Sequence, residues 1–259
     1  MVAARHALLL VALSLGGCAT LSTTGEVEPD YAQDAETNLA RGNQAFESRN
    51  YAEALKYFEH VRSRYPYLDV AKRAELRIAD THFAREEYIE ARDAYLNFVK
   101  LHPTWPQVDY AAFRAALTHY KEIPSDFFLL PPSEEKDQAE VKNALRAMQD
   151  FVRQYPNSEY RAQAEEIVAD VRRRLARHEL YVASFYARRE RWRAVASRLE
   201  TVAEEYQGLG FDEQALFGLH NAYTHLNEKE KARKALEEIL ARMPGTRAAE
   251  KAKALLGQS

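Results

Sequence analysis

The feature that most constrains the fold is a stretch that occurs twice. NYAEALKYFEHVRSRYP, from Asn50 to Pro66, is echoed 37 residues later by EYIEARDAYLNFVKLHP, which ends at Pro103. Both copies space apolar residues three and four apart, as an amphipathic helix does, and each ends in a proline that cannot continue the helix. A chain that repeats one unit at a fixed interval folds as a stack of such units. We therefore expect a repeat protein.

Small and aromatic residues match the tetratricopeptide pattern, in which two small residues let paired helices approach, an aromatic fills the next groove and a proline ends the unit. Three units carry this set: Gly42, Ala54, Phe58 and Pro66; Ala79, Ala91, Tyr95 and Pro103; and, more weakly, His220, Ala232, Leu236 and Pro244. No convincing strand pattern appears. The sequence predicts an all-α fold, an α-solenoid of about five tetratricopeptide-like helix hairpins.

Two of the five expected hairpins are irregular. The third pairs a helix over about 107–121 with one that ends at Pro156, and EIPSDFFLLPPSEE separates them. The fourth begins with an unbroken helix over about 158–189, followed by WRAVASRLETVAEEY. We expect a closing helix over 247–256. Each hairpin is stable only against its neighbours.

The start of the chain is typical of a secretory leader. ALLLVALSL, from Ala7 to Leu15, has the length of a signal-peptide core and is too short to span a bilayer. It leads through two glycines to Cys18, the only cysteine, and LSLGGC resembles the lipobox of bacterial lipoproteins. The resemblance implies cleavage before Cys18 and a covalent lipid on its sulfur. An ordinary signal peptide with an incidental cysteine is the alternative.

These signals divide the chain into three parts. Residues 1–17 are the expected lipoprotein signal peptide, and 18–34 are the lipidated cysteine and a flexible linker with four acids and no base. Residues 35–259 form the expected solenoid, with a substrate-groove half over 35–121 and a partner-docking half over 157–259. Ala19 follows the anchor, and by the rule of the lipoprotein class this residue points to the periplasmic face of the outer membrane.

No catalytic constellation is apparent. The phosphate-loop, dinucleotide, HExxH and GxSxG motifs are absent, and lipidation would remove the one thiol from chemistry. His220 and His225 are five apart on one helix and diverge, so no metal site is expected. The formal net charge of -3 argues against general nucleic-acid binding. We expect no enzyme, no metal and no cofactor other than the lipid on Cys18.

A solenoid of hairpins offers a groove lined by the first helix of each unit. An extended peptide suits such a groove, because polar groups can pair with its backbone while apolar pockets take its side chains. The three phenylalanines in this set have an alternative role, packing between adjacent hairpins. The residues expected in the peptide-binding groove are Asn43, Phe46, Glu47, Arg73, Arg77, Asp80, Phe83, Tyr110 and Phe113.

A basic stretch lies in the other half. From Arg172 to Arg198 there are nine arginines and two glutamates, a local charge of +7. Cleavage before Cys18 would remove Arg5, so the mature chain would carry a net charge of -4. Its residues outside this basic stretch therefore sum to a charge of -11. Such a separation of positive from negative charge along the chain can steer an acidic partner to the basic stretch. An arginine-rich solvated surface with Trp192 in the hairpin core is the alternative. The residues expected to dock a partner are Arg188, Arg189, Trp192, Arg193 and Arg198.

The insert DFFLLPPS, from Asp126 to Ser133, places four large apolar residues in a proline-rich loop. Exposed, it would be a docking patch, and folded back it would cover a gap in the solenoid. Both interpretations stay open.

Three further stretches carry a family resemblance: KLHPTWPQVDY (Lys100 to Tyr110), FVRQYPNSEY (Phe151 to Tyr160) and RRLARHELYVASFYARRERWRAVASRLE (Arg173 to Glu200). With the lipobox and five repeats, the chain resembles the BamD (ComL) family, outer-membrane β-barrel assembly lipoproteins. The resemblance covers nearly the whole mature chain. The chain departs from the family in the apolar insert and in YQG at Tyr206 to Gly208, where Tyr-Pro is usual.

The resemblance implies a non-enzymatic periplasmic adaptor. Its first repeats would receive targeting segments of unfolded outer-membrane β-barrel proteins, and its last repeats would dock the periplasmic domain of BamA. Other Bam lipoproteins are further candidate partners, and the two departures bear on those contacts. A scaffold for pilus-secretin assembly or cell-division coordination is the alternative function. A cell-wall enzyme would need convergent carboxylates or a Ser-His pair.

Overall fold

The computed structural model describes residues 29–124 and 133–257, and the described part is helical without a strand. The signal peptide, Cys18 and most of the DFFLLPPS insert lie outside the described residues. The helices are α1 (Ala35–Glu47), α2 (Tyr51–Arg64), α3 (Asp69–Ala84), α4 (Tyr88–Leu101), α5 (Val108–Glu122), the 3-10 helix η1 (Ser133–Glu135), α6 (Ala139–Gln154), α7 (Arg161–Ala187), α8 (Trp192–Glu205), α9 (Asp212–His225), α10 (Lys229–Arg242) and α11 (Arg247–Leu256).

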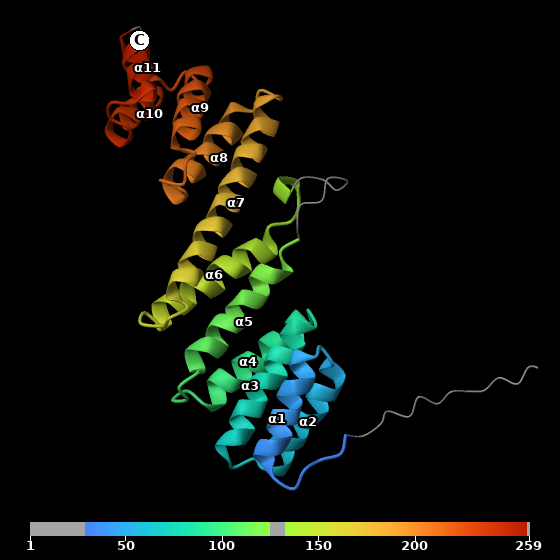
Figure 1. Cartoon of the computed structure of the whole chain (residues 1–259). Coiled ribbons are helices and arrows are strands. Elements are labelled where there is room, and N and C mark those ends of the chain that lie inside the picture. The colour runs from blue at the N-terminus through green and yellow to red at the C-terminus, as the bar shows by residue number, and fades with distance from the viewer. Residues whose placement is uncertain (1–28, 125–132, 258–259) are drawn as a thin grey trace, which may run out of the picture.

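Consecutive helices pack side by side as antiparallel hairpins, which stack along the chain into one elongated solenoid (Figure 1). The 27-residue α7 extends well beyond its neighbour α6 and links the N-terminal hairpins to the C-terminal ones (Figure 1). The prediction of an all-α solenoid is confirmed, as are the long helix of the fourth unit and the closing helix. None of the described helices is both long enough and apolar enough to cross a membrane.

The turn inside a hairpin has the same geometry in four units. Arg49, Glu86, Glu190 and Asn227 have φ between 55° and 61°, and each lies between the two helices of its hairpin. In each case the residue that follows the left-handed one donates its amide to a carbonyl five residues before the donor. Asn50, for example, donates to the Ala45 carbonyl at 2.9 Å. This bond closes the first helix with a left-handed residue. The third hairpin has no such turn among its described residues, because the insert replaces it.

The core follows the repeat pattern. Ala54, Phe58, Ala79, Ala91 and Tyr95 are all fully buried. A Cβ on Gly42 would come within 2.5 Å of the Phe58 ring, so the small residue is what lets α1 and α2 approach. At the weaker last unit, the His220 ring instead lies 3.1 Å from the Ala232 carbonyl oxygen. Four apolar clusters divide the described core along the solenoid, as expected for units stabilised by their neighbours.

Candidate functional site

Two hollows lie on the face built by the first helices of the hairpins. The first, about 300 Å³, is lined by Leu39, Asn43, Arg73, Leu76, Arg77, Asp80, Gln107 and Tyr110. The second, about 510 Å³, is lined by Phe83, Arg114, Leu117, Tyr120, Lys121, Gln163, Glu166, Ile167 and Asp170. The lining residues belong to α1, α3, α5 and α7, except Gln107, which caps α5. We call the two hollows together the first-helix groove.

A buried carboxylate joins three helices at the floor of the groove. Asp80 is 7% exposed and accepts hydrogen bonds from the hydroxyls of Tyr95 at 2.5 Å and Tyr110 at 2.6 Å. Arg77 donates to its other oxygen at 3.2 Å. Burial, with the Asp80 charge as the next cause, raises the pKa of both tyrosines far above its usual range. Both hydroxyls therefore stay protonated and hold the carboxylate in place.

An arginine covers one aromatic ring in or beside each hollow. The Arg77 guanidinium lies 4.1 Å from the Phe46 ring centre, and that of Arg114 lies 3.7 Å from the Phe83 ring centre. Both partners of the second pair lie 37 residues after those of the first, so the repeat reproduces the pair. Phe46 and Phe83 are thus cation–π partners rather than open apolar pockets. The groove presents guanidinium edges backed by aromatic rings.

Phe113 is a correction to the predicted site. It is 3% exposed and packs in the core against Phe151 and Tyr160, with ring centres 5.5 and 5.1 Å away. The residue equivalent to Arg77 in the third unit is Arg114, one position later. One residue turns the side chain by about 100° around a helix, which moves it from the groove to the core. The packing interpretation holds for Phe113.

The other predicted groove residues fall into two groups. Asn43, Arg73, Arg77, Asp80 and Tyr110 line the first hollow, and Phe83 lines the second. Glu47 is exposed at the end of α1, and neither Glu47 nor the predicted Phe46 lines a hollow.

Bonds between neighbouring helices fix the wall of the first hollow. Arg77 Nε donates to Asn43 Oδ1 at 2.8 Å, and Arg73 pairs with Glu36. Each bond links α1 to α3, so the wall is held in place without a ligand.

Sequence reasoning missed part of the groove. Arg114 has the clearest signal, because it lies 37 residues after Arg77. The contribution of α7 had no such signal, since the insert breaks the spacing. There Tyr120 donates to Asp170 Oδ2 at 3.0 Å, and Arg174 donates to the same oxygen at 3.1 Å. The groove therefore continues into the fourth hairpin.

The basic stretch divides into a paired and an open part. Arg172, Arg174, Arg177 and Arg198 all bond to other elements or to acids, as Arg198 does to Glu179 at 3.0 Å. These contacts hold α7 in place.

The open part surrounds the turn between α7 and α8. Arg188, Arg189, Arg191 and Arg193 are exposed there, and none of them has an ion-pair partner among the described residues. We call these four residues the arginine turn. Trp192 inside it is half-buried and stacks on His225 at 3.9 Å, so one ring face is covered.

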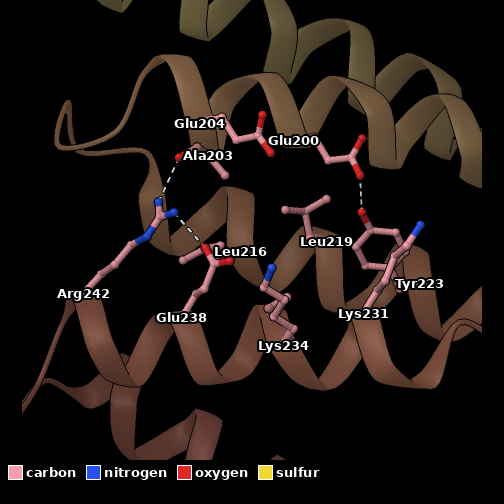
Figure 2. A pocket seen from close by; sticks show the side chains of 11 residues that line it. Glu200, Ala203, Glu204, Leu216, Leu219, Tyr223, Lys231, Lys234, Glu238 and Arg242 are labelled. Atoms are coloured by element: carbon pink, nitrogen blue, oxygen red, sulfur yellow. Dashed lines mark hydrogen bonds and ion pairs between the residues drawn. The ribbon is translucent and has the colours of Figure 1, made fainter.

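A third hollow, about 250 Å³, lies between α8 and α10 with α9 as its floor (Figure 2). Its ends are closed by internal bonds. Arg242 donates to the Ala203 carbonyl at 2.8 Å and to Glu238 at 2.7 Å, and Tyr223 donates to Glu200 (Figure 2). Its walls carry both signs of charge, and Arg242 and Glu238 at one end pair with each other. It belongs to the packing of the last hairpins.

Within the described ranges, one group of side chains has ligand atoms close enough for a metal. Ligand atoms of His119, Glu122 and Glu140 lie within 4.8 Å of one another. Arg92 already occupies this place, since its Nη1 donates to Glu122 at 2.6 Å and lies 3.2 Å from His119 Nδ1. The cluster is an ion-pair network that joins α4, α5 and α6.

Comparison with known proteins identifies the family. The model of the YfiO family, described as outer membrane lipoprotein, matches residues 31–239. The chain belongs to the YfiO family. The matched segment runs from just before α1 into α10, so it includes the first-helix groove and the arginine turn.

Relatives of this chain include two proteins named outer membrane protein assembly factor BamD. The protein of Caulobacter vibrioides is 28% identical over 241 residues, which cover 93% of this chain and 76% of the relative. That of Neisseria gonorrhoeae is 29% identical over 239 residues, which cover 90% and 89%. Among solved structures, the TPR2AB-domain:pHSP90 complex of yeast Sti1 matches with a TM-score of 0.43 at 13% identity, over 86% of this chain and 82% of that one.

Proposed function

We propose that this chain is a non-enzymatic adaptor in the assembly of outer-membrane β-barrel proteins. Extended segments of unfolded barrel proteins would lie in the first-helix groove, and the periplasmic domain of BamA would dock on the C-terminal half through the arginine turn. The observation that carries the proposal is the family match, which spans both surfaces. Relatives over most of the chain are named assembly factors.

The groove has the chemistry for reversible capture of a peptide. Arg73 and Gln107 are donors at its rim, and Leu39 and Leu76 are apolar residues in its lining. The Asp80 network holds the floor rigid, so little conformational entropy is lost on binding. An extended segment could pair its carbonyls with the rim donors and place alternate side chains in the two hollows.

A lipid on Cys18 completes the proposal. Three acyl chains would anchor the protein stably at the periplasmic face of the outer membrane, whereas one chain binds only marginally. Tethering also raises the effective concentration of the groove near a membrane-embedded partner, so the individual contacts can be weak. Mass spectrometry of the mature N-terminus tests the anchor directly, and an unmodified cysteine would contradict it.

Site-specific photo-crosslinking in living cells tests the adaptor. A photoreactive residue at Arg73 or Gln107 should capture barrel proteins during their assembly, and one at Arg188 or Arg193 should capture BamA. Asp150 is exposed on α6, which lines neither hollow and precedes the docking half, and is the control position. Crosslinks to a pilus secretin or to cell-division proteins would replace the proposal with the alternative scaffold. Absence of barrel and BamA adducts at all four positions would reject it.

A further inference from the structure

Large apolar side chains are exposed at one end of the first two hairpins. Tyr67 is 96% exposed and Leu68 is 52% exposed in the turn between α2 and α3, and Leu101 at the end of α4 is 57% exposed. His102 lies 2.7 Å from Glu75, and Lys72 lies 4.6 Å from the Trp105 ring centre, so the end of α4 lies beside the beginning of α3. Nothing among the described residues covers these side chains.

Basic residues accompany the apolar ones. Arg62, Arg64 and Lys100 are exposed at the same end, and no ion pair of theirs occurs among the described residues. The acid that follows Leu68 is Asp69, which pairs with Lys72 at 2.8 Å. Glu59 lies about a turn further from the end of α2. We define the N-terminal tip as Arg62, Arg64, Tyr67, Leu68, Lys100 and Leu101.

The chain leaves the solenoid beside this tip. The Tyr65 hydroxyl donates to the Gln33 carbonyl at 2.8 Å, and Tyr31 stacks on His60 with ring centres 3.9 Å apart. Residues 31–33 therefore lie against the last turns of α2 (Figure 1). Cys18 lies eleven residues before Pro29, so even a fully extended segment spans at most about 40 Å. A bilayer that holds a lipid on Cys18 is never far from the tip.

We propose that the N-terminal tip contacts the surface of the bilayer in which the protein is anchored. Tyr67, Leu68 and Leu101 enter the headgroup region, and Arg62, Arg64 and Lys100 lie among the lipid phosphates. Aromatic side chains prefer the membrane interface, and basic residues add attraction to anionic lipids. The contact orients the solenoid relative to the membrane. This inference rests on the proposed lipid anchor, which supplies the proximity.

Fluorescence quenching by labelled lipid tests the contact. Because lipidation consumes the one native thiol, Ser63→Cys gives the full lipidated protein a single reactive thiol beside the tip. A fluorescent label is attached to this thiol. The protein is reconstituted in vesicles of phosphatidylethanolamine and phosphatidylglycerol that contain a brominated lipid. A group held about 5–10 Å into the interface should lose roughly half of its fluorescence. A label at Ser197→Cys, exposed on α8, should lose little.

Two matched variants separate the tip from general exposure. Tyr67→Ser with Leu68→Ser should reduce quenching of the Ser63 label to the level of the Ser197 label. Ile89→Ser with Leu96→Ser changes two side chains of similar exposure, 58% and 52%, outside the tip, and should leave quenching unchanged. All four positions are exposed, so the fold should survive, and circular dichroism checks this.

Three outcomes would overturn the inference, and they are distinguishable. Protein that stays on the vesicles without quenching at Ser63 would place the tip in water. Protein that leaves the vesicles altogether would reject the lipid anchor and this inference with it. Protection of the label by an unfolded barrel polypeptide in detergent, but not by lipid, would show that the tip binds protein instead.

Discussion

At the residue scale, the groove depends on one buried carboxylate. Asp80 accepts hydrogen bonds from two tyrosine hydroxyls and from an arginine, and these donors come from α3, α4 and α5. A buried polar group without a partner is costly, so the value of Asp80 lies in the donors that it satisfies.

Asp80→Ala should lower the free energy of unfolding by about 3 kcal/mol, because the buried Tyr95 hydroxyl, the half-buried Tyr110 hydroxyl and the Arg77 guanidinium each lose an acceptor. Urea denaturation measures this loss. Asp93→Ala, at an exposed position on the neighbouring α4, is the control and should change stability by about 0.5 kcal/mol or less. Equal effects of the two variants would show that the network contributes nothing.

Alkaline pH should destabilise the protein through its buried tyrosines. Burial, with the charges of Glu205 and Glu179, raises the pKa of Tyr206 from its usual 10.0 to about 12. The unfolded chain releases this proton first as the pH rises, so the stabilisation is complete below pH 10 and is lost between about pH 10 and 12. The urea midpoint should fall over this range. Tyr206→Phe should flatten the fall, and an unchanged slope would contradict the assignment.

At the element scale, close approach of paired helices sets the hairpin. Gly42 touches the fully buried Phe58 ring, and the turn after α1 uses a left-handed arginine, Arg49, with φ of 61°. The same turn recurs at Glu86, 37 residues later. The hairpin is thus determined by one small residue and by a turn that accepts several residue types.

Gly42→Ala should destabilise the protein by about 1–3 kcal/mol, because the new methyl group overlaps the Phe58 ring. Within a helix, Gly→Ala usually raises stability, so the loss expected at Gly42 has the opposite sign. Gly257→Ala is the control, since its added Cβ would have no neighbour closer than 3.6 Å. Thermal unfolding measures both, and a stabilised Gly42→Ala would refute the close approach.

At the scale of the whole molecule, stability passes from neighbour to neighbour. Apart from α1, which also reaches α3, the helices pack mainly against those next to them in the chain, and the core divides into four clusters among the described residues. Such a solenoid responds locally to damage at one end. The first hollow of the groove and the arginine turn therefore lie in parts of the solenoid that can unfold separately.

Truncation after Thr246 removes α11, whose Ala248 and Ala252 are buried against the last cluster. Amide hydrogen exchange should rise in α9 and α10 by about tenfold or more and stay unchanged in α1 to α5, because the latter belong to other clusters. Mass spectrometry of peptides resolves the two regions. A uniform rise along the chain would show that the solenoid unfolds as one unit.

The sequence by itself determined the repeat, the hairpin positions and the closing helix. Helical periodicity and close packing at Gly42 and Ala54 are local properties of the chain, so they can be read before the fold is known. The groove required more. Whether Phe113 or Arg114 faces the ligand depends on one residue of register, about 100° of rotation. Only the tertiary structure fixed that rotation, placed α7 in the groove and set Arg77 over Phe46 and Arg114 over Phe83, because these contacts depend on how neighbouring helices pack.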